Sequence, residues 1–97
     1  MIRHVVLFSW TAEATAAQRQ RVADELRTLP PLMNGLSSYE IGPDAGIIEG
    51  NFDFAVVAEF DTRESYLAYR EHPAHQAVIK QFIRPITGAR ASVQYQI

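Results

Sequence analysis

The stretch Phe52-Asp53-Phe54-Ala55-Val56-Val57-Ala58-Glu59-Phe60 decides the fold, because it is the clearest β-strand in the chain. Side chains alternate between the two faces of a strand, and here both faces carry apolar residues. One face holds Phe54, Val56, Ala58 and Phe60, and the other holds Asp53, Ala55, Val57 and Glu59. A sheet built on this strand therefore needs cover on both faces.

The residues before this strand predict two more strands and one helix. His4 to Trp10 is a strand with His4, Val6, Phe8 and Trp10 on one face and Val5 and Leu7 on the other. A helix follows, which Thr15 and Gln18 cap and Pro30-Pro31 ends. The second strand runs from Leu36 to Ile41, Gly42-Pro43 closes it, and residues 44–51 form a loop.

The residues after Phe60 predict two helices and a last strand. Asp61 and Glu64 form a cap at the start of the first of these helices, which Pro73 breaks. Proline is favoured at the first position of a helix, so a third helix begins there and runs until Pro85. Arg90 to Ile97 alternates between polar and apolar side chains and forms the last strand.

If the two helices separated at Pro73 are taken as one broken helix, the order is strand, helix, strand, strand, helix, strand. This is the order of the ferredoxin-like α+β fold, βαββαβ: a four-stranded antiparallel sheet with helices on one face. Residues 1–97 show no linker, repeat or low-complexity segment, so we expect a single domain. The face without helices still carries Val5, Leu7, Ala55 and Val57. Such a patch is unusual on a monomer, and we expect a homodimer in which sheet packs on sheet; the alternative is a half-exposed sheet with small residues on that face.

The composition excludes several classes of function. The chain has 97 residues, 47% of them hydrophobic, with a net charge of −2 and no cysteine. This charge argues against a large basic nucleic-acid-binding surface and leaves room for a local basic patch, while the absence of cysteine excludes disulfide and thiolate chemistry. Its apolar runs fall far short of the ~20 residues that span a membrane, and no signal peptide is recognisable, so we expect a cytoplasmic protein. There is no glycine-rich phosphate loop and no serine elbow.

The densest cluster of chemically active side chains is Tyr66-Leu67-Ala68-Tyr69-Arg70-Glu71-His72-Pro73-Ala74-His75. It resembles the stress-responsive A/B barrel (Dabb) family, in which an aromatic-rich segment runs into His-Pro-Ala-His. Ile2-Arg3-His4-Val5-Val6-Leu7-Phe8 is similar to that family's first strand. Asn51-Phe52-Asp53-Phe54-Ala55, followed by Glu59-Phe60-Asp61, is similar to its third. The resemblance covers residues 2–85 and implies a dimeric α+β barrel.

The resemblance also implies candidate catalytic residues. Polyketide cyclases of this family use a first-strand histidine, the last histidine of His-Pro-Ala-His and two tyrosines. By position these are His4, His75 and Tyr69, whereas the second tyrosine falls at Leu26, so one hydroxyl of that set is absent here.

These side chains suit acid–base chemistry on general grounds. An aldol-type ring closure needs a base beside a carbonyl and a donor for the developing oxyanion. Histidine titrates near neutral pH, so we assign His75 as the base, with Tyr69 and His4 as orienting donors. The expected pocket lies between the sheet and the helices, and its apolar walls are Val6, Phe8, Trp10, Phe54, Val56 and Phe82.

Three functions remain open from the sequence. The first is the binding of a small apolar molecule, with no catalysis required. The second is a cofactor-independent enzyme, of cyclase, lyase or monooxygenase type, acting on a polyketide-like carbonyl compound with His75 as base. The third is a structural dimer without a usable pocket. No cofactor is expected in any of them.

The histidines also have simpler roles. His72 before Pro73 is typical of a helix cap, and His75 can pin two helices through a backbone carbonyl. His4, His72 and His75 are a three-histidine combination, but Pro73 disturbs their spacing, so we expect no metal site. Some family members hold magnesium through main-chain carbonyls after the first helix, Leu29 to Asn34 here, and such ligation leaves no side-chain pattern.

Overall fold

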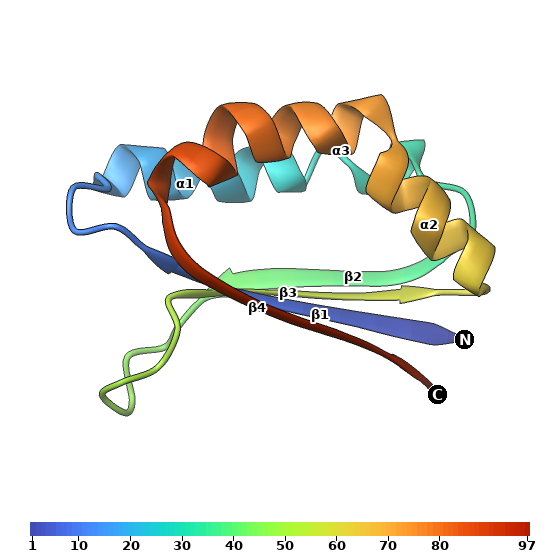
Figure 1. Cartoon of the computed structure of the whole chain (residues 1–97), viewed down its shortest axis with the longest axis horizontal. Helices are drawn as coiled ribbons and strands as arrows, with labels where there is room; N and C mark the ends of the chain where they lie inside the picture. Colours follow the sequence, from blue (N-terminus) through green and yellow to red (C-terminus); the bar gives the residue numbers. More distant parts are fainter.

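The computed structural model describes residues 1–97 and contains a four-stranded antiparallel sheet. Its strands are β1 (Ile2–Trp10), β2 (Leu36–Pro43), β3 (Phe54–Phe60) and β4 (Thr87–Gln96), in the order β2-β3-β1-β4. The helical segments all lie over one face of the sheet, and the loop between β2 and β3 extends on the opposite side (Figure 1). The ferredoxin-like fold expected from the order of elements is confirmed.

The helical layer contains three α-helices: α1 (Ala16–Leu26), α2 (Arg63–Glu71) and α3 (Pro73–Val78). Shorter segments join them to the strands: the 3₁₀ turns η1 (Pro30–Leu32) and η3 (Arg84–Ile86), and the π-helical segment η2 (Ile79–Ile83). None of these helices combines the length and the apolar character needed to span a membrane.

Helix α1 begins as its sequence predicts. Thr15 Oγ1 accepts the backbone N–H of Gln18 at 3.1 Å, and Gln18 Oε1 accepts the backbone N–H of Thr15 at 2.9 Å. Two of the N–H groups that every helix leaves unpaired at its start are thus satisfied, and the predicted capping box is confirmed.

Helix α2 begins differently from the prediction. Its cap is Thr62, whose Oγ1 accepts the backbone N–H of Ser65 at 3.1 Å, so the assignment to Asp61 and Glu64 is wrong. The Asp61 carboxylate instead accepts the hydroxyl of Ser37 at 2.6 Å. Asp61 and Thr62 are both residue types that cap helices well. The contact of Asp61 with Ser37, at the start of β2, is tertiary and does not show in the local sequence.

The strand bounds differ from the sequence prediction by two or three residues. Strand β1 begins at Ile2 and not His4, β3 at Phe54 and not Phe52, and β4 at Thr87 and not Arg90, while β2 continues to Pro43. The neighbouring strands are the reason, because Ile2 pairs with both β3 and β4, and Pro43 pairs with β3. Such pairing does not show in the alternation of one strand.

The helix predicted from Pro73 to Pro85 changes its geometry after Val78. The backbone N–H of Arg84 bonds to the Ile79 carbonyl, five residues earlier, which is π-helical spacing. Pro85 has no N–H to give to a carbonyl one α-turn earlier, so the α-helical ladder cannot continue through it. The chain widens into η2 and then turns into β4.

The core lies between the sheet and the helical layer. The largest fully buried side chains come from α1, the turn after it and β3; they are Phe60, Leu26, Leu29, Val22 and Val56. The other face of the sheet has no cover within the chain. As predicted, it carries Val5, Leu7, Ala55 and Val57, all half-buried.

Candidate functional site

A cavity of about 440 Å³ opens between the sheet and the helical layer. Its floor comes from β1 and β3, its roof from α1, α2, α3 and η2, and its open side from η3 and β4. The lining residues are His4, Val6, Phe8, Leu26, Val56, Tyr66, Tyr69, Arg70, His75, Gln76, Ile79, Ile83, Arg84, Thr87 and Arg90. All three residues predicted to be catalytic, His4, Tyr69 and His75, are among them.

His4 lies on β1, on the face that the helices cover, and is 5% exposed. Its Nδ1 accepts a hydrogen bond from the Gln94 side-chain amide nitrogen at 2.9 Å, because an amide nitrogen only donates. This fixes the proton on Nε2. Nε2 forms no hydrogen bond with the protein. Every buried side-chain nitrogen and oxygen of the chain has a hydrogen-bond partner, so Nε2 is not buried and faces the cavity that His4 lines. Burial, with the charges of Arg90 and His75, lowers the pKa of His4 to about 4.

His75 follows Pro73 in α3 and carries its proton on the other ring nitrogen. Its Nδ1 is 3.1 Å from the Arg70 carbonyl oxygen, which only accepts, so Nδ1 donates and Nε2 keeps a free lone pair. That lone pair also reaches the cavity, since no buried polar atom is unpartnered. Burial lowers the pKa of His75. The expected pinning role and a base role are thus compatible, because they use different nitrogens.

Tyr69 is buried beside both histidines. Its ring centre lies 4.2 Å from that of His75 and 6.2 Å from that of His4. Its hydroxyl is 3.3 Å from the hydroxyl of Tyr39 on β2, and no hydrogen bond joins it to either imidazole. Burial raises the pKa of Tyr69, which keeps the hydroxyl protonated as a donor.

The predicted apolar walls are found in part. Val6, Phe8 and Val56 line the cavity, whereas Trp10, Phe54 and Phe82 do not. The Trp10 ring stacks on Phe8 at 5.7 Å and packs on Phe54, beyond the cavity end of the sheet. Phe82 faces α1, where the guanidinium of Arg21 lies 4.7 Å from its ring centre. Ile79 and Ile83 of η2 line the cavity instead.

Several lining residues were not predicted from the sequence. Tyr66, whose ring centre lies 4.9 Å from that of His4, belongs to the quoted motif and could have been included. Arg70, Gln76, Arg84 and Arg90 read as surface residues, because nothing local shows that they border a cavity. Tyr39 on β2 carries no sequence signal for its contact with Tyr69.

The side chains form no cluster of three or more histidine, cysteine or acidic groups that could hold a metal ion. His72 caps α3, as predicted: its Nδ1 accepts the backbone N–H of Ala74 at 3.0 Å. In Leu29 to Asn34, the carbonyls of Leu29 and Pro30 accept backbone N–H groups and close η1. That segment does not border the cavity.

The chain thus combines a ferredoxin-like βαββαβ fold with a cavity between its sheet and its helices that two histidines line. A model of the stress responsive A/B barrel domain (Dabb) matches residues 2–97, and the chain belongs to this family. None of the curated proteins compared with the chain matches it.

Solved structures share the fold over nearly the whole chain. A dimeric ferredoxin-like protein of unknown function from Thermobifida fusca is 38% identical, with a TM-score of 0.93 over 99% of this chain and 90% of that one. A Dabb family protein from Mesorhizobium loti is 20% identical, with a TM-score of 0.81 over 99% and 95%. A hydroxynitrile lyase from Passiflora edulis is 18% identical, with a TM-score of 0.84 over 99% and 92%. The last two likenesses concern the fold alone.

Proposed function

We propose that this chain binds a small, largely apolar molecule in the cavity between its sheet and its helices. The observation that carries the proposal is the cavity itself, whose volume of about 440 Å³ lies in the range of small-molecule sites. Its apolar walls are Val6, Phe8, Leu26, Val56, Ile79 and Ile83. A purely structural dimer with a filled interior is less consistent with a cavity of this size.

The test is native mass spectrometry of the protein purified from its own host, followed by titration with any co-purified molecule. Ile79→Trp places a large ring in the cavity from a half-buried position, and we expect it to abolish binding. Leu67→Trp is the matched control, because Leu67 is 40% exposed on α2 and does not line the cavity. Equal binding by both variants would place the ligand elsewhere and refute the proposal.

The two histidines favour a second candidate function, acid–base catalysis without a cofactor. His75 presents a free lone pair at Nε2, and His4 presents an N–H at Nε2, to the same cavity. For a ligand with a carbonyl, His75 would take the proton from the adjacent carbon. The electron pair of the broken C–H bond moves to the carbonyl oxygen, where the His4 N–H donates to the enolate. Its lowered pKa keeps His75 an unprotonated base at neutral pH, and the lowered pKa of His4 keeps that ring a neutral N–H donor.

Catalysis is compatible with this scaffold, since a hydroxynitrile lyase shares the fold, although a shared fold does not define an activity. The co-purified molecule, incubated with protein in D₂O, tests the step by exchange of the hydrogen beside its carbonyl. We expect wild-type protein and His72→Asn to catalyse the exchange and His75→Ala to lose it by about 100-fold or more. Exchange at the wild-type rate by His75→Ala would remove that residue from the role, while binding could persist.

We further infer that a second copy of the chain covers the open face of the sheet. On β4, Ala91 and Val93 lie opposite Leu7 and Val5, so the apolar strip continues to the sheet edge. Val93 is 53% exposed in the single chain. The β2–β3 loop extends on this side (Figure 1) and carries two exposed side chains, Ile47 and Ile48.

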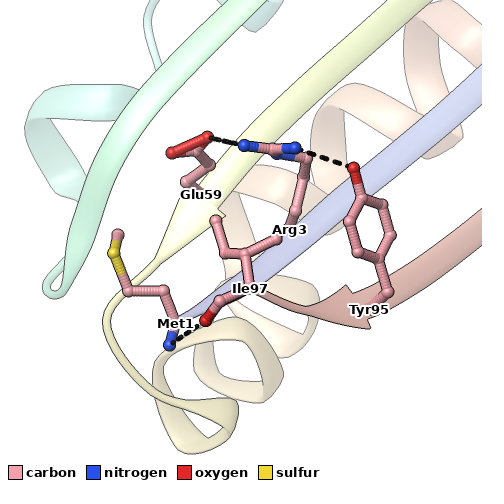
Figure 2. A network of polar contacts seen from close by, with 5 residues as sticks. All are labelled: Met1, Arg3, Glu59, Tyr95 and Ile97. Atoms are coloured by element: carbon pink, nitrogen blue, oxygen red, sulfur yellow. Dashed lines mark hydrogen bonds and ion pairs between the residues drawn. The ribbon is translucent and has the colours of Figure 1, made fainter.

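Charged groups border this strip at one end of the sheet. Arg3 forms an ion pair with Glu59 at 3.0 Å and donates to the Tyr95 hydroxyl at 2.8 Å, which links β3, β1 and β4 (Figure 2). An apolar centre with a polar rim is the usual composition of a subunit interface. The description of the Thermobifida fusca relative as dimeric supports the same assembly here.

A further inference from the structure

Three arginines border the cavity from three different elements. Arg70 comes from α2, Arg84 from η3 and Arg90 from β4. The lining set contains no aspartate or glutamate. A cavity with three cations and no anion stands out in a chain whose net charge is −2.

None of the three guanidinium groups has a carboxylate partner. The ion pairs of the chain are Arg3 with Glu59 and Arg21 with Glu25, both outside the cavity. Glu71 follows Arg70 directly in α2, and neighbours in a helix point in different directions. Like charges gathered at one cavity repel each other, and an anion bound among them relieves that repulsion.

The positive charge reaches the chemically active end of the cavity. Arg90 pairs with Phe8 across β1 and β4, so its side chain lies on the face that the helices cover. Its charge contributes to the lowered pKa of both His4 and His75, and Arg70 contributes at His75. The arginines and the histidines therefore act on the same space.

Parts of the floor and the roof of the cavity are apolar. Val6 and Val56 line the floor, and Ile79 and Ile83 line the roof. A ligand that satisfies both parts has an apolar body and an anionic end. A guanidinium group presents paired N–H donors whose spacing matches two oxygens of a carboxylate or a phosphate. A hydroxyl or an amide offers only one oxygen and no negative charge, so it cannot form the same pair of charge-assisted hydrogen bonds.

We propose that the cavity recognises amphipathic small molecules with one oxyanion group, which Arg84 and Arg90 bind at the open side while the apolar part lies between the sheet and η2. The inference rests on the proposed binding function and narrows it to anionic ligands. It also revises the expectation of a purely apolar ligand, because the open side of the cavity is basic.

The test compares probes that share one apolar chain and differ at the end: octanoate, octyl phosphate and 1-octanol, each titrated by calorimetry. We expect at least one anionic probe to bind about tenfold or more tightly than 1-octanol, since charge-assisted bonds are stronger than neutral ones. The anion with the higher affinity distinguishes a carboxylate site from a phosphate site.

Single variants then assign the effect to the cavity. Arg90→Gln should weaken anion binding about five- to tenfold and leave 1-octanol unchanged. Arg84→Gln is the second variant, and both residues are exposed, so the fold should tolerate the change. Arg27→Gln is the matched control, an exposed arginine at the end of α1 that does not line the cavity.

The outcomes separate the two proposals. If all three probes bind with equal affinity, or if the Arg84 and Arg90 variants bind anions like wild type, anion recognition is refuted and the binding function stands. If no probe binds, and Ile79→Trp does not alter the retention of any host molecule, both proposals are refuted.

Discussion

The two cavity histidines differ in the ring nitrogen that faces the protein. A backbone carbonyl holds the Nδ1 proton of His75, whereas a side-chain amide donates to Nδ1 of His4. The same residue type therefore offers a lone pair in one case and an N–H in the other. Their shared burial lowers the pKa of both, so both remain neutral where histidine ordinarily begins to titrate.

This predicts a loss of stability in mild acid. The pKa of His4 is about 4 in the folded chain and 6.5 in the unfolded one, so below pH 6.5 the unfolded state binds the proton first. The free energy of unfolding should fall as the pH drops from about 6.5 to about 4, with a His4 contribution of roughly 3 kcal/mol. The lowered pKa of His75 acts in the same direction.

Urea denaturation at fixed protein concentration and several pH values measures the effect. His4→Gln should show a shallower pH dependence than wild type over this range. His72→Asn is the control, because it also removes a histidine and asparagine keeps the cap at α3. If the pH dependence of His4→Gln equals that of wild type, His4 does not titrate as described.

At the scale of elements, the start of β2 is joined closely to α2. Gly35 has a φ of +75°, and a Cβ built on it would lie 2.2 Å from Ser65 Oγ and 2.8 Å from Ser65 Cβ. The Gly35 carbonyl also accepts the backbone N–H of Asp61 at 2.8 Å. This contact holds α2, and with it Tyr69, in place over the sheet.

Gly35→Ala should therefore destabilise the chain by about 2–4 kcal/mol, because it combines a strained backbone with a steric clash. Gly46→Ala is the matched control: its φ is +74°, but nothing lies within 4 Å of the added Cβ, so only the strain remains. Thermal and urea denaturation give both values. Equal losses in the two variants would show that the contact with Ser65 contributes nothing.

At the scale of the whole molecule, the two faces of the sheet serve different purposes. One face supports the core and the cavity under the helices, and the other presents an apolar strip that the chain does not cover. Burial of that strip by a second copy would remove it from water without closing the cavity, which opens on the helical side. Binding and assembly would then be separable by mutation.

Val93→Asp should separate them. The residue is exposed in the single chain, so the fold should tolerate the change, whereas a carboxylate in an apolar interface should weaken the dimer by about 100-fold or more. Analytical ultracentrifugation at micromolar concentration should show a dimer for wild type and a monomer for Val93→Asp. Ser92→Asp, one residue earlier and on the opposite face of β4, should remain dimeric. A monomeric wild type would refute the assembly.

Local patterns were enough for the architecture. Alternation in β1 and β3, the capping box at Thr15 and the prolines at 30–31 and 73 predict the elements and their order. The motif around His-Pro-Ala-His also identified His75 and Tyr69, and the first strand identified His4, as residues that meet in one cavity. The prediction of the elements succeeds because periodicity, caps and helix breaks depend on residues close together in the chain.

Only the tertiary structure decides which residues form the cavity walls, which tautomer His4 and His75 adopt, and which charged side chains border the cavity. Ile79 and Ile83, and not Phe82, line the cavity, and Gln94, 90 residues from His4, sets which nitrogen of that ring is free. Arg70, Arg84 and Arg90 border the same cavity from three separate elements, α2, η3 and β4. Local sequence determines the elements, since their hydrogen bonds are short-range, whereas a binding site is assembled from contacts that the packing of those elements creates.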